Sequence, residues 1–154
     1  MANPPVVIYT DGAALNNPGP GGYGVVMKYG TLRKELSKGF KKTTNNRMEL
    51  LAVIEGLRAL KRPGLNVVIY SDSKYVVDAV EKKWVFGWQQ KNFKGKKNPD
   101  LWQEFLKVYP QHKVTFRWVK GHAGNIENER CDELATTAAA QSAFETDFGY
   151  EQGI

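Results

Sequence analysis

The segments Val6-Val7-Ile8-Tyr9-Thr10-Asp11 and Val67-Val68-Ile69-Tyr70-Ser71-Asp72 are nearly identical, and each is an apolar, β-branched run that ends in an aspartate. Such runs predict buried strands. If the two strands are adjacent and parallel, Asp11 and Asp72 lie at the same strand end, where open α/β sheets bind ligands. Strands are about 4.8 Å apart, so the carboxylates come close and repel each other unless a divalent cation lies between them. The pair therefore predicts a metal site.

The sequence around these two strands predicts a mixed sheet with helices packed on it, without a second domain. Further strands are expected over residues 23–29, 32–40 and 114–119, the first two joined as a hairpin. Asparagine, proline and glycine make residues 16–22 a predicted turn. Helices are expected from near Arg47, capped by Asn45 or Asn46, then after Ser73, from Pro99, and over 127–140.

Composition narrows the class of protein. Of the 154 residues, 42% are hydrophobic and 25% charged, as in ordinary soluble domains. The net charge of +6 favours an anionic partner, although a solvated basic surface gives the same balance. A lone cysteine, Cys131, excludes an internal disulfide and fits a reducing compartment. Since neither a secretory signal nor a membrane-spanning run is apparent, we expect a cytoplasmic protein without membrane contact.

Residues 81–98 interleave aromatic rings with lysines. Lysines bind phosphates and aromatic faces pack on sugars or bases, so this stretch suits nucleic acid. The alternative is that Trp84 and Trp88 belong to a helix core. The tail over residues 141–154 has three acidic and no basic side chains, and we expect it to be mobile.

Two more acids are candidates for the predicted metal site. Glu49 lies in the first turn of its expected helix, away from the apolar stripe, and Asp132 lies beside the apolar face of the last helix. Four carboxylates without clustered cysteine or histidine suit Mg²⁺ or Mn²⁺ rather than zinc. Taken singly, each acid is also explained as a turn residue, a cap or a partner of a helix dipole.

Several segments together resemble bacterial type 1 ribonuclease H, in order from about residue 5 to residue 140. They are Thr10-Asp11-Gly12, residues 17–24 and 43–50, Ser71-Asp72-Ser73, residues 118–124 and residues 127–135. The resemblance implies an α/β fold with a five-stranded mixed sheet flanked by helices, a catalytic domain over residues 1–140 and an acidic tail over 141–154. It also implies a monomeric endoribonuclease that hydrolyses the RNA strand of RNA–DNA hybrids and leaves 5′-phosphate and 3′-hydroxyl ends.

The resemblance also implies roles for the acids. With substrate bound, two Mg²⁺ ions about 3.5–4 Å apart would clamp the attacking and leaving oxygens, Mn²⁺ being a possible substitute. Asp11 would bridge both ions, Asp72 would serve the ion that activates water, and Glu49 and Asp132 would hold the other. His122, in a glycine-flanked loop, suits proton transfer or product release, although a loop histidine alone is more often merely solvated.

Substrate contacts are likewise implied by the resemblance. Asn17, Asn45 and Lys74 match contacts to the RNA strand, although Lys74 replaces a glutamine common in the family. Further matches are Thr44 and Asn98, which would hold a DNA phosphate, and Asn46, Tyr75 and Trp84, which would line the channel for the DNA strand. The lysine-rich stretch between Trp88 and Trp102 is shorter than usual, which bears on how tightly it grips substrate.

Two other classes of protein are compatible with parts of this pattern. An integrase- or resolvase-like nuclease has a similar acidic set, but the segment Asn45-Asn46-Arg47-Met48-Glu49 argues against it. A noncatalytic nucleic-acid-binding module would not need the four acids together with His122.

Overall fold

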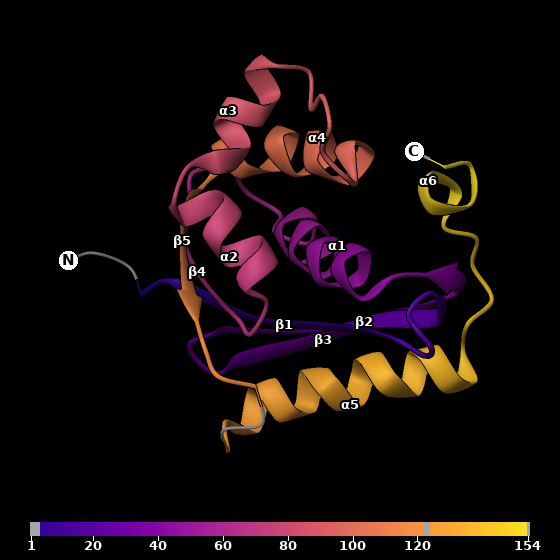
Figure 1. The fold of residues 1–154 in the computed structure, drawn as a ribbon. Coiled ribbons are helices and arrows are strands. Elements are labelled where there is room, and N and C mark those ends of the chain that lie inside the picture. The colour runs from indigo at the N-terminus through magenta and orange to yellow at the C-terminus, as the bar shows by residue number, and fades with distance from the viewer. Residues whose placement is uncertain (1–3, 122–123, 154) are drawn as a thin grey trace.

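The computed structural model describes residues 4–121 and 124–153, and its centre is a five-stranded sheet (Figure 1). The strands are β1 (Val6–Ala14), β2 (Gly19–Tyr29), β3 (Leu32–Thr43), β4 (Asn66–Ser71) and β5 (Lys113–Trp118). They are arranged in the order β3-β2-β1-β4-β5. β2 pairs antiparallel with β1 and with β3, whereas β1–β4 and β4–β5 are parallel. The predicted mixed sheet is therefore confirmed.

The two nearly identical strands are adjacent and parallel, which is the arrangement on which the predicted metal site depends. Tyr9 lies opposite Tyr70 in the register, and their rings stack with centroids 5.1 Å apart. One detail of the prediction was wrong, because β1 does not end at Asp11. It continues to Ala14 while paired with β2, although its pairing with β4 has already stopped at Tyr9. Asp11 thus lies where β1 and β4 part, at the carboxyl end of their parallel pairing and between two interior strands of the sheet.

Helices cover both faces of the sheet, with α5 on one face and α1 on the other (Figure 1). Their bounds are α1 (Asn45–Arg58), α2 (Lys74–Glu81), α3 (Trp84–Gln90), α4 (Pro99–Val108), the 3-10 helix η1 (Tyr109–Gln111), α5 (Ile126–Gln141) and α6 (Phe148–Glu151). Ser73 caps α2 and Pro99 opens α4, as predicted.

The start of α1 differs from the prediction. Thr44 caps the helix, since its extended backbone lets its hydroxyl accept a hydrogen bond from the Arg47 amide. The Asn45 side chain is not available for capping because its oxygen accepts from the Ala14 amide at 2.6 Å. Glu49 consequently lies one turn into α1 rather than in its first turn.

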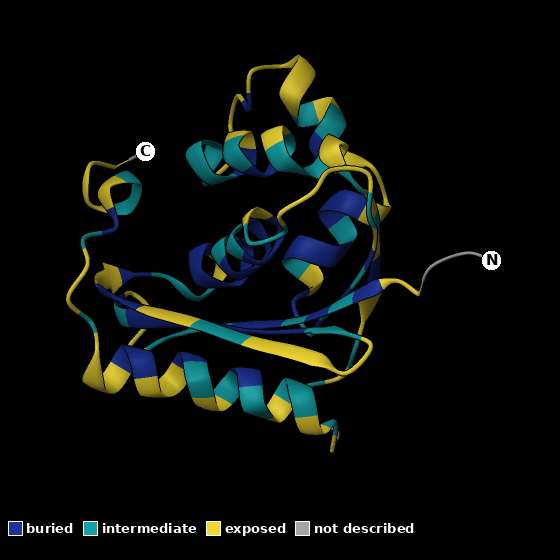
Figure 2. Cartoon of the chain, turned by 180° about the vertical axis from the view of Figure 1, so that it is seen from behind, coloured by how far each residue is buried: buried dark blue, intermediate teal, exposed yellow. Residues whose placement is uncertain are grey.

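The turn predicted over residues 16–22 is confirmed only in its first part: residues 15–18 form a turn, and β2 already begins at Gly19. A Cβ at Gly22 would lie 2.7 Å from the Ala135 carbonyl oxygen, and a Cβ at Gly24 would overlap the Cys131 carbonyl oxygen. Glycine therefore lets the backbone of α5 lie directly on β2. Figure 2 shows the buried side of α5 turned toward the sheet. The glycines thus fix how closely α5 approaches the sheet.

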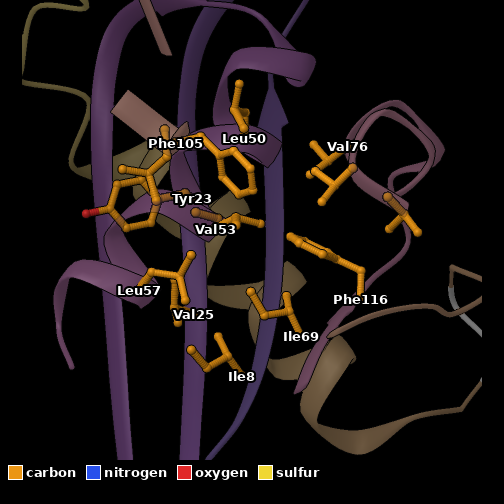
Figure 3. Packing of buried hydrophobic residues seen from close by; sticks show 14 of the residues in the cluster. Ile8, Tyr23, Val25, Leu50, Val53, Leu57, Ile69, Val76, Phe105 and Phe116 are labelled. Carbon is orange, nitrogen blue, oxygen red and sulfur yellow. The ribbon is translucent and has the colours of Figure 1, made fainter. Parts of the chain in front are cut away.

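The main core lies between the sheet and the helices on the α1 side. Figure 3 shows Leu50, Val53 and Leu57 of α1 gathered with Ile8 and Val25 of the sheet, all of which are buried. Burial of such side chains stabilises the fold by roughly 1.5–3 kcal/mol each. This core holds α1 against β1, which carries Asp11.

The lysine-rich stretch combines both predicted possibilities. The Trp88 ring packs edge-on against the fully buried Trp102 at 5.8 Å, whereas Trp84 is 49% exposed. Lys82 lies over the exposed Trp84 ring, 5.2 Å from its centroid. One side of this stretch is therefore core and the other is surface.

Residues 142–153, which follow α5, are ordered, and the expectation that this segment is mobile was wrong. Glu145 forms a bridge with Phe40 of β3, and Asp147 is buried and caps α6. An ion pair with Arg47, which the sequence did not reveal, holds this carboxylate in place. Within the described residues, none of the helices is sufficiently long and apolar to span a bilayer.

Candidate active site

Three predicted acids meet at the point where β1 and β4 part. Asp11 comes from β1, Glu49 from α1 and Asp72 from the residue after β4, and their carboxylate oxygens lie within 4.8 Å of one another. Gly12 permits this meeting, because a Cβ there would overlap the Glu49 amide nitrogen. The missing side chain lets β1 contact α1 backbone to backbone and brings Glu49 to Asp11.

The fourth acid reaches the same place from α5. A crevice with a volume of about 10 Å³, called here the acidic crevice, lies at this point. It is lined by Asp11, Asp72, Gly121, Asn128, Glu129 and Asp132. This volume is room for one water-sized occupant. The sequence did not single out Asn128, yet its spacing of four residues from Asp132 places both on one side of α5.

Without a cation, the buried carboxylates of the acidic crevice repel one another. Burial, together with the charges of Asp72 and Asp132, raises the pKa of Asp11 to about 7, although hydrogen bonds from Glu49 and Gly12 oppose the change. Burial and the neighbouring Asp11 and Asp72 raise the pKa of Glu49 well above its ordinary value. Uncompensated buried carboxylates destabilise a fold.

Two buried oxygens at this site lack a partner. Among the described residues, Glu49 Oε1 and Asn128 Oδ1 are buried side-chain oxygens without a hydrogen bond. Buried oxygens of this kind are normally satisfied, and a set of carboxylate and amide oxygens is what a hard divalent cation binds. The residues present therefore fit a metal ion such as Mg²⁺.

A larger groove lies beside the start of α1 and has a volume of about 680 Å³. This polar groove is lined by Asn17, Thr44, Asn45, Asn46, Lys96, Lys97, Asn98, Tyr150 and Gly153. Five of the predicted nucleic-acid contacts therefore share it. The Asn17 side-chain oxygen accepts from the Asn45 amide at 3.0 Å, which ties the loop before β2 to α1.

The other three predicted contacts do not line the polar groove. The Lys74 ammonium lies 4.8 Å from the centroid of the Trp118 ring, and Trp84 is on the exposed surface. The Tyr75 hydroxyl accepts from Asn98 Nδ2 at 3.0 Å and from Trp102 Nε1 at 2.9 Å. Tyr75 therefore orients Asn98 from behind the groove.

His122, the remaining predicted residue, lies outside the described residues. Gly121, the last described residue before it, lies beside the acidic crevice, because a Cβ there would lie 3.0 Å from Asp72 Oδ2. Asp72 is held in turn by β5, since the Trp118 indole donates to its carbonyl oxygen at 3.0 Å.

Comparisons with known proteins agree on one family. The family model described as RNase H matches residues 3–140. Ribonuclease H of Syntrophus aciditrophicus is 53% identical over 150 residues, covering 94% of this chain and 86% of that protein. Ribonuclease HI of Synechocystis is 51% identical over 158 residues, covering 97% of this chain and 98% of that protein.

Solved structures show the same fold. LC9-RNase H1, described as a type 1 RNase H with the type 2 active-site motif, superposes with a TM-score of 0.81 at 38% identity. That match covers 99% of this chain and 82% of the other. LC11-RNase H1, solved in complex with an RNA/DNA hybrid, has a TM-score of 0.68 at 27% identity, covering 88% and 97% of the two chains. All four acids lie within the matched residues, and the chain belongs to the ribonuclease H family of nucleases, which are hydrolases.

Proposed function

We propose that this protein is an endonuclease that hydrolyses the RNA strand of RNA–DNA hybrids and depends on Mg²⁺. The observation that carries the proposal is the meeting of Asp11, Glu49 and Asp72 within 4.8 Å, beside Asp132, in a chain of the ribonuclease H family. The related LC11-RNase H1 binds an RNA/DNA hybrid in its solved structure, which supports the same substrate class here.

The four acids are the groups that would hold the metal. Two Mg²⁺ ions, or Mn²⁺ in their place, would lower the pKa of an attacking water and neutralise charge on the phosphate oxygens. In this proposal Asp11 would be a ligand of both ions, Asp72 would hold the ion that activates water, and Glu49 and Asp132 would hold the other. In-line attack on the phosphodiester then leaves a 5′-phosphate and a 3′-hydroxyl.

The chain's own hydrogen bonds orient these acids. The Gly12 amide donates to Asp11 Oδ1 at 2.9 Å, and the Val119 amide donates to the Ser71 carbonyl oxygen at 2.9 Å. With the contact from Trp118, these bonds fix the backbone on both sides of the acidic crevice. Fixed geometry favours in-line attack because little reorganisation is left for the reaction itself. His122 is proposed to move a proton or to ease product release.

The polar groove is proposed to hold the hybrid. Distinguishing a hybrid from other duplexes requires 2′-hydroxyl contacts on one strand and deoxyribose on the other. In this proposal Asn17, Asn45 and Lys74 contact the RNA strand. The DNA strand would be held by Thr44 and Asn98 at a phosphate, and by Asn46, Tyr75 and Trp84 along its channel.

Three further expectations belong to this proposal. Residues 1–140 form the catalytic domain and residues 141–154 an accessory tail; the protein acts as a monomer, and it acts in the cytoplasm. The buried thiol of Cys131 suits a reducing compartment. Light scattering coupled to gel filtration tests the monomer, since a mass near 17.3 kDa is expected and twice that mass contradicts it.

The decisive experiment compares end-labelled RNA–DNA hybrid, double-stranded RNA and double-stranded DNA, each with Mg²⁺ and with EDTA. Cleavage of RNA only in the hybrid, only with Mg²⁺, is expected, and the Asp11→Asn variant should bind the hybrid without cutting it. Wild-type cleavage rates in that variant would contradict the proposal. Binding without cleavage by the wild type would support the noncatalytic module instead. DNA nicking or strand transfer would support the integrase-like alternative.

A further inference from the structure

The tail crosses from one face of the sheet to the other. After α5 the chain passes β3 at the sheet edge, where the Lys41 amide donates to the Glu145 carbonyl oxygen at 2.8 Å. It then forms α6 on the face that carries α1 (Figure 1). The tail therefore ends beside the first turn of α1, which is one wall of the polar groove.

Arg47 and Asp147 anchor the tail at that place. Asp147 is 7% exposed and Arg47 is 1% exposed. Arg47 Nε donates to Asp147 Oδ2 at 2.8 Å and Arg47 Nη2 donates to Asp147 Oδ1 at 2.9 Å, while the Thr43 hydroxyl donates to the same carboxylate at 2.6 Å. A bidentate ion pair of this kind restricts the orientation of the Asp147 carboxylate as well as its position. The tail is thus a fixed part of the fold.

The same anchor connects the tail to the predicted phosphate contact. Arg47 Nη1 donates to Asn98 Oδ1 at 3.2 Å, and the Tyr150 amide donates to Asp147 Oδ1 at 3.3 Å. Arg47 also donates to the Asp100 carboxylate, from Nη1 at 2.9 Å and from Nη2 at 2.6 Å. Gly149 lies directly on this network, because a Cβ there would overlap the Asp100 carboxylate. One buried guanidinium therefore sets the position of Asn98 and that of Tyr150.

Tyr150 and Gly153 line the polar groove together with Thr44, Lys96, Lys97 and Asn98. Tyr150 is only half-buried, so its ring is accessible from the groove. Hydroxyl and amide groups beside lysines are the side chains that contact phosphate and sugar in nucleic-acid complexes. A tyrosine adds a hydroxyl that can donate a hydrogen bond and a flat face that packs on a sugar or base.

We infer that Tyr150 is a further contact for the nucleic-acid backbone, so that the segment 145–153 forms one wall of the substrate-binding groove. The inference rests on the proposed function, in which this groove receives the RNA–DNA hybrid. It gives the tail a part in binding substrate and none in the chemical step, because none of the described tail residues lines the acidic crevice.

The test compares Tyr150→Phe, Tyr150→Ala and a matched control, Phe148→Ala. Phe148 is on the same short helix, is 67% exposed and does not line the groove. Steady-state cleavage of a labelled hybrid in Mg²⁺ gives KM and kcat for each variant. We expect Tyr150→Phe to raise KM about 3-fold and Tyr150→Ala about 10-fold. We expect kcat to stay close to that of the wild type in both, and Phe148→Ala to change neither constant.

A salt series separates a neutral contact from a charged one. Tyr150→Ala should weaken hybrid binding at every salt concentration without changing the slope of log binding constant against log salt concentration. Lys97→Ala should reduce the magnitude of that slope by about 1. An unchanged KM in Tyr150→Ala would overturn the inference, as would a loss confined to kcat, which would indicate disturbed acids. If the wild type itself leaves the hybrid intact, the proposed function fails instead. Thermal melting confirms that all four variants are folded.

Discussion

Replacing Asp11 by asparagine removes one charge from the acidic crevice and leaves the side chain's shape nearly unchanged. The pKa of Asp11 is about 7 against an ordinary 3.8, mainly because of burial. A tenfold change in a protonation equilibrium corresponds to about 1.4 kcal/mol, so ionisation at pH 8 costs the fold at most about 4 kcal/mol. The real cost is smaller because burial and the neighbouring acids also raise the pKa of Glu49, which lessens the repulsion that Asp11 meets on ionising. We therefore expect Asp11→Asn to stabilise the metal-free protein by about 2 kcal/mol, or about 4–8 °C in Tm.

The sign of the pH dependence follows from the raised pKa of Asp11. The folded state holds this proton more tightly than the unfolded state, so wild-type stability falls as the pH rises from about 4 through 7. The advantage of Asp11→Asn should therefore vanish near pH 4 and be complete by pH 8. Thermal melts in EDTA over this range measure it directly.

With Mg²⁺ the wild type should melt at a higher temperature than Asp11→Asn, which reverses the order expected in EDTA. A cation at 100 times its Kd stabilises the folded state by about 2.7 kcal/mol, and the wild type should gain this while Asp11→Asn gains much less. Glu133→Gln is the control, because this exposed glutamate pairs only at the surface and should melt like the wild type. If Asp11→Asn melts below the wild type in EDTA at pH 8, or responds equally to Mg²⁺, the electrostatic reasoning is wrong.

Three further predictions concern the tail, the glycines and the substrate. Asp147→Ala removes one of the two carboxylates that pair with the buried Arg47 guanidinium, the other being Asp100, and should cost about 3 kcal/mol, or roughly 6–12 °C in Tm. Burial favours a higher pKa for Asp147, but the hydrogen bonds from Arg47 outweigh burial and lower that pKa. The difference in Tm between the wild type and Asp147→Ala should therefore disappear below about pH 4. A difference in Tm that stays constant with pH would contradict this. Gly24→Ala should lower Tm because its Cβ overlaps a backbone carbonyl of α5, whereas Gly87→Ala, with open space around it, should stabilise α3 by about 0.5–1 kcal/mol; equal effects would refute the close-packing argument. Hybrid binding measured by anisotropy should weaken steeply with salt, and a flat log–log plot would exclude phosphate contacts by the lysines.

The sequence was sufficient for the sheet and for the acids because both depend on regular patterns. Two apolar runs with the same residues pointed to two adjacent strands, and the register confirms this with Tyr9 opposite Tyr70. Glu49 and Asp132 were found as acids beside apolar helix faces. Such patterns are local, and alternation or helical spacing fixes which side chains share a face.

The glycines from Gly19 to Gly22 show where local patterns mislead. Turns favour glycine because it adopts unusual backbone angles, and on that ground the sequence predicts a turn that extends to Gly22, with a strand only from residue 23. Here Gly22 and Gly24 are glycines because a helix lies against them, and that helix comes from residues 126–141. A partner so far away in the sequence leaves no local signal.

The tail was misjudged for a related reason. Three acids without a base suggested solvent exposure, but Asp147 is buried because Arg47, a hundred positions earlier, neutralises it. The segment that contains Arg47 pointed to Glu49 as a functional residue and gave no sign of a role for the charge of Arg47. Asn128 was missed in the same way, because its orphaned oxygen becomes visible only once the acidic crevice is assembled.

The pairing of Arg47 with Asp147 also has a consequence for how the protein is made. A nascent chain that has emerged as far as α5 already contains all four acids and every strand of the sheet. Its Arg47 nevertheless lacks one carboxylate until residue 147 leaves the ribosome. Prematurely terminated products would therefore carry the cleavage machinery on a weakened scaffold, which proteases remove more readily than the finished protein. Completion of translation thus becomes a condition for a long-lived nuclease.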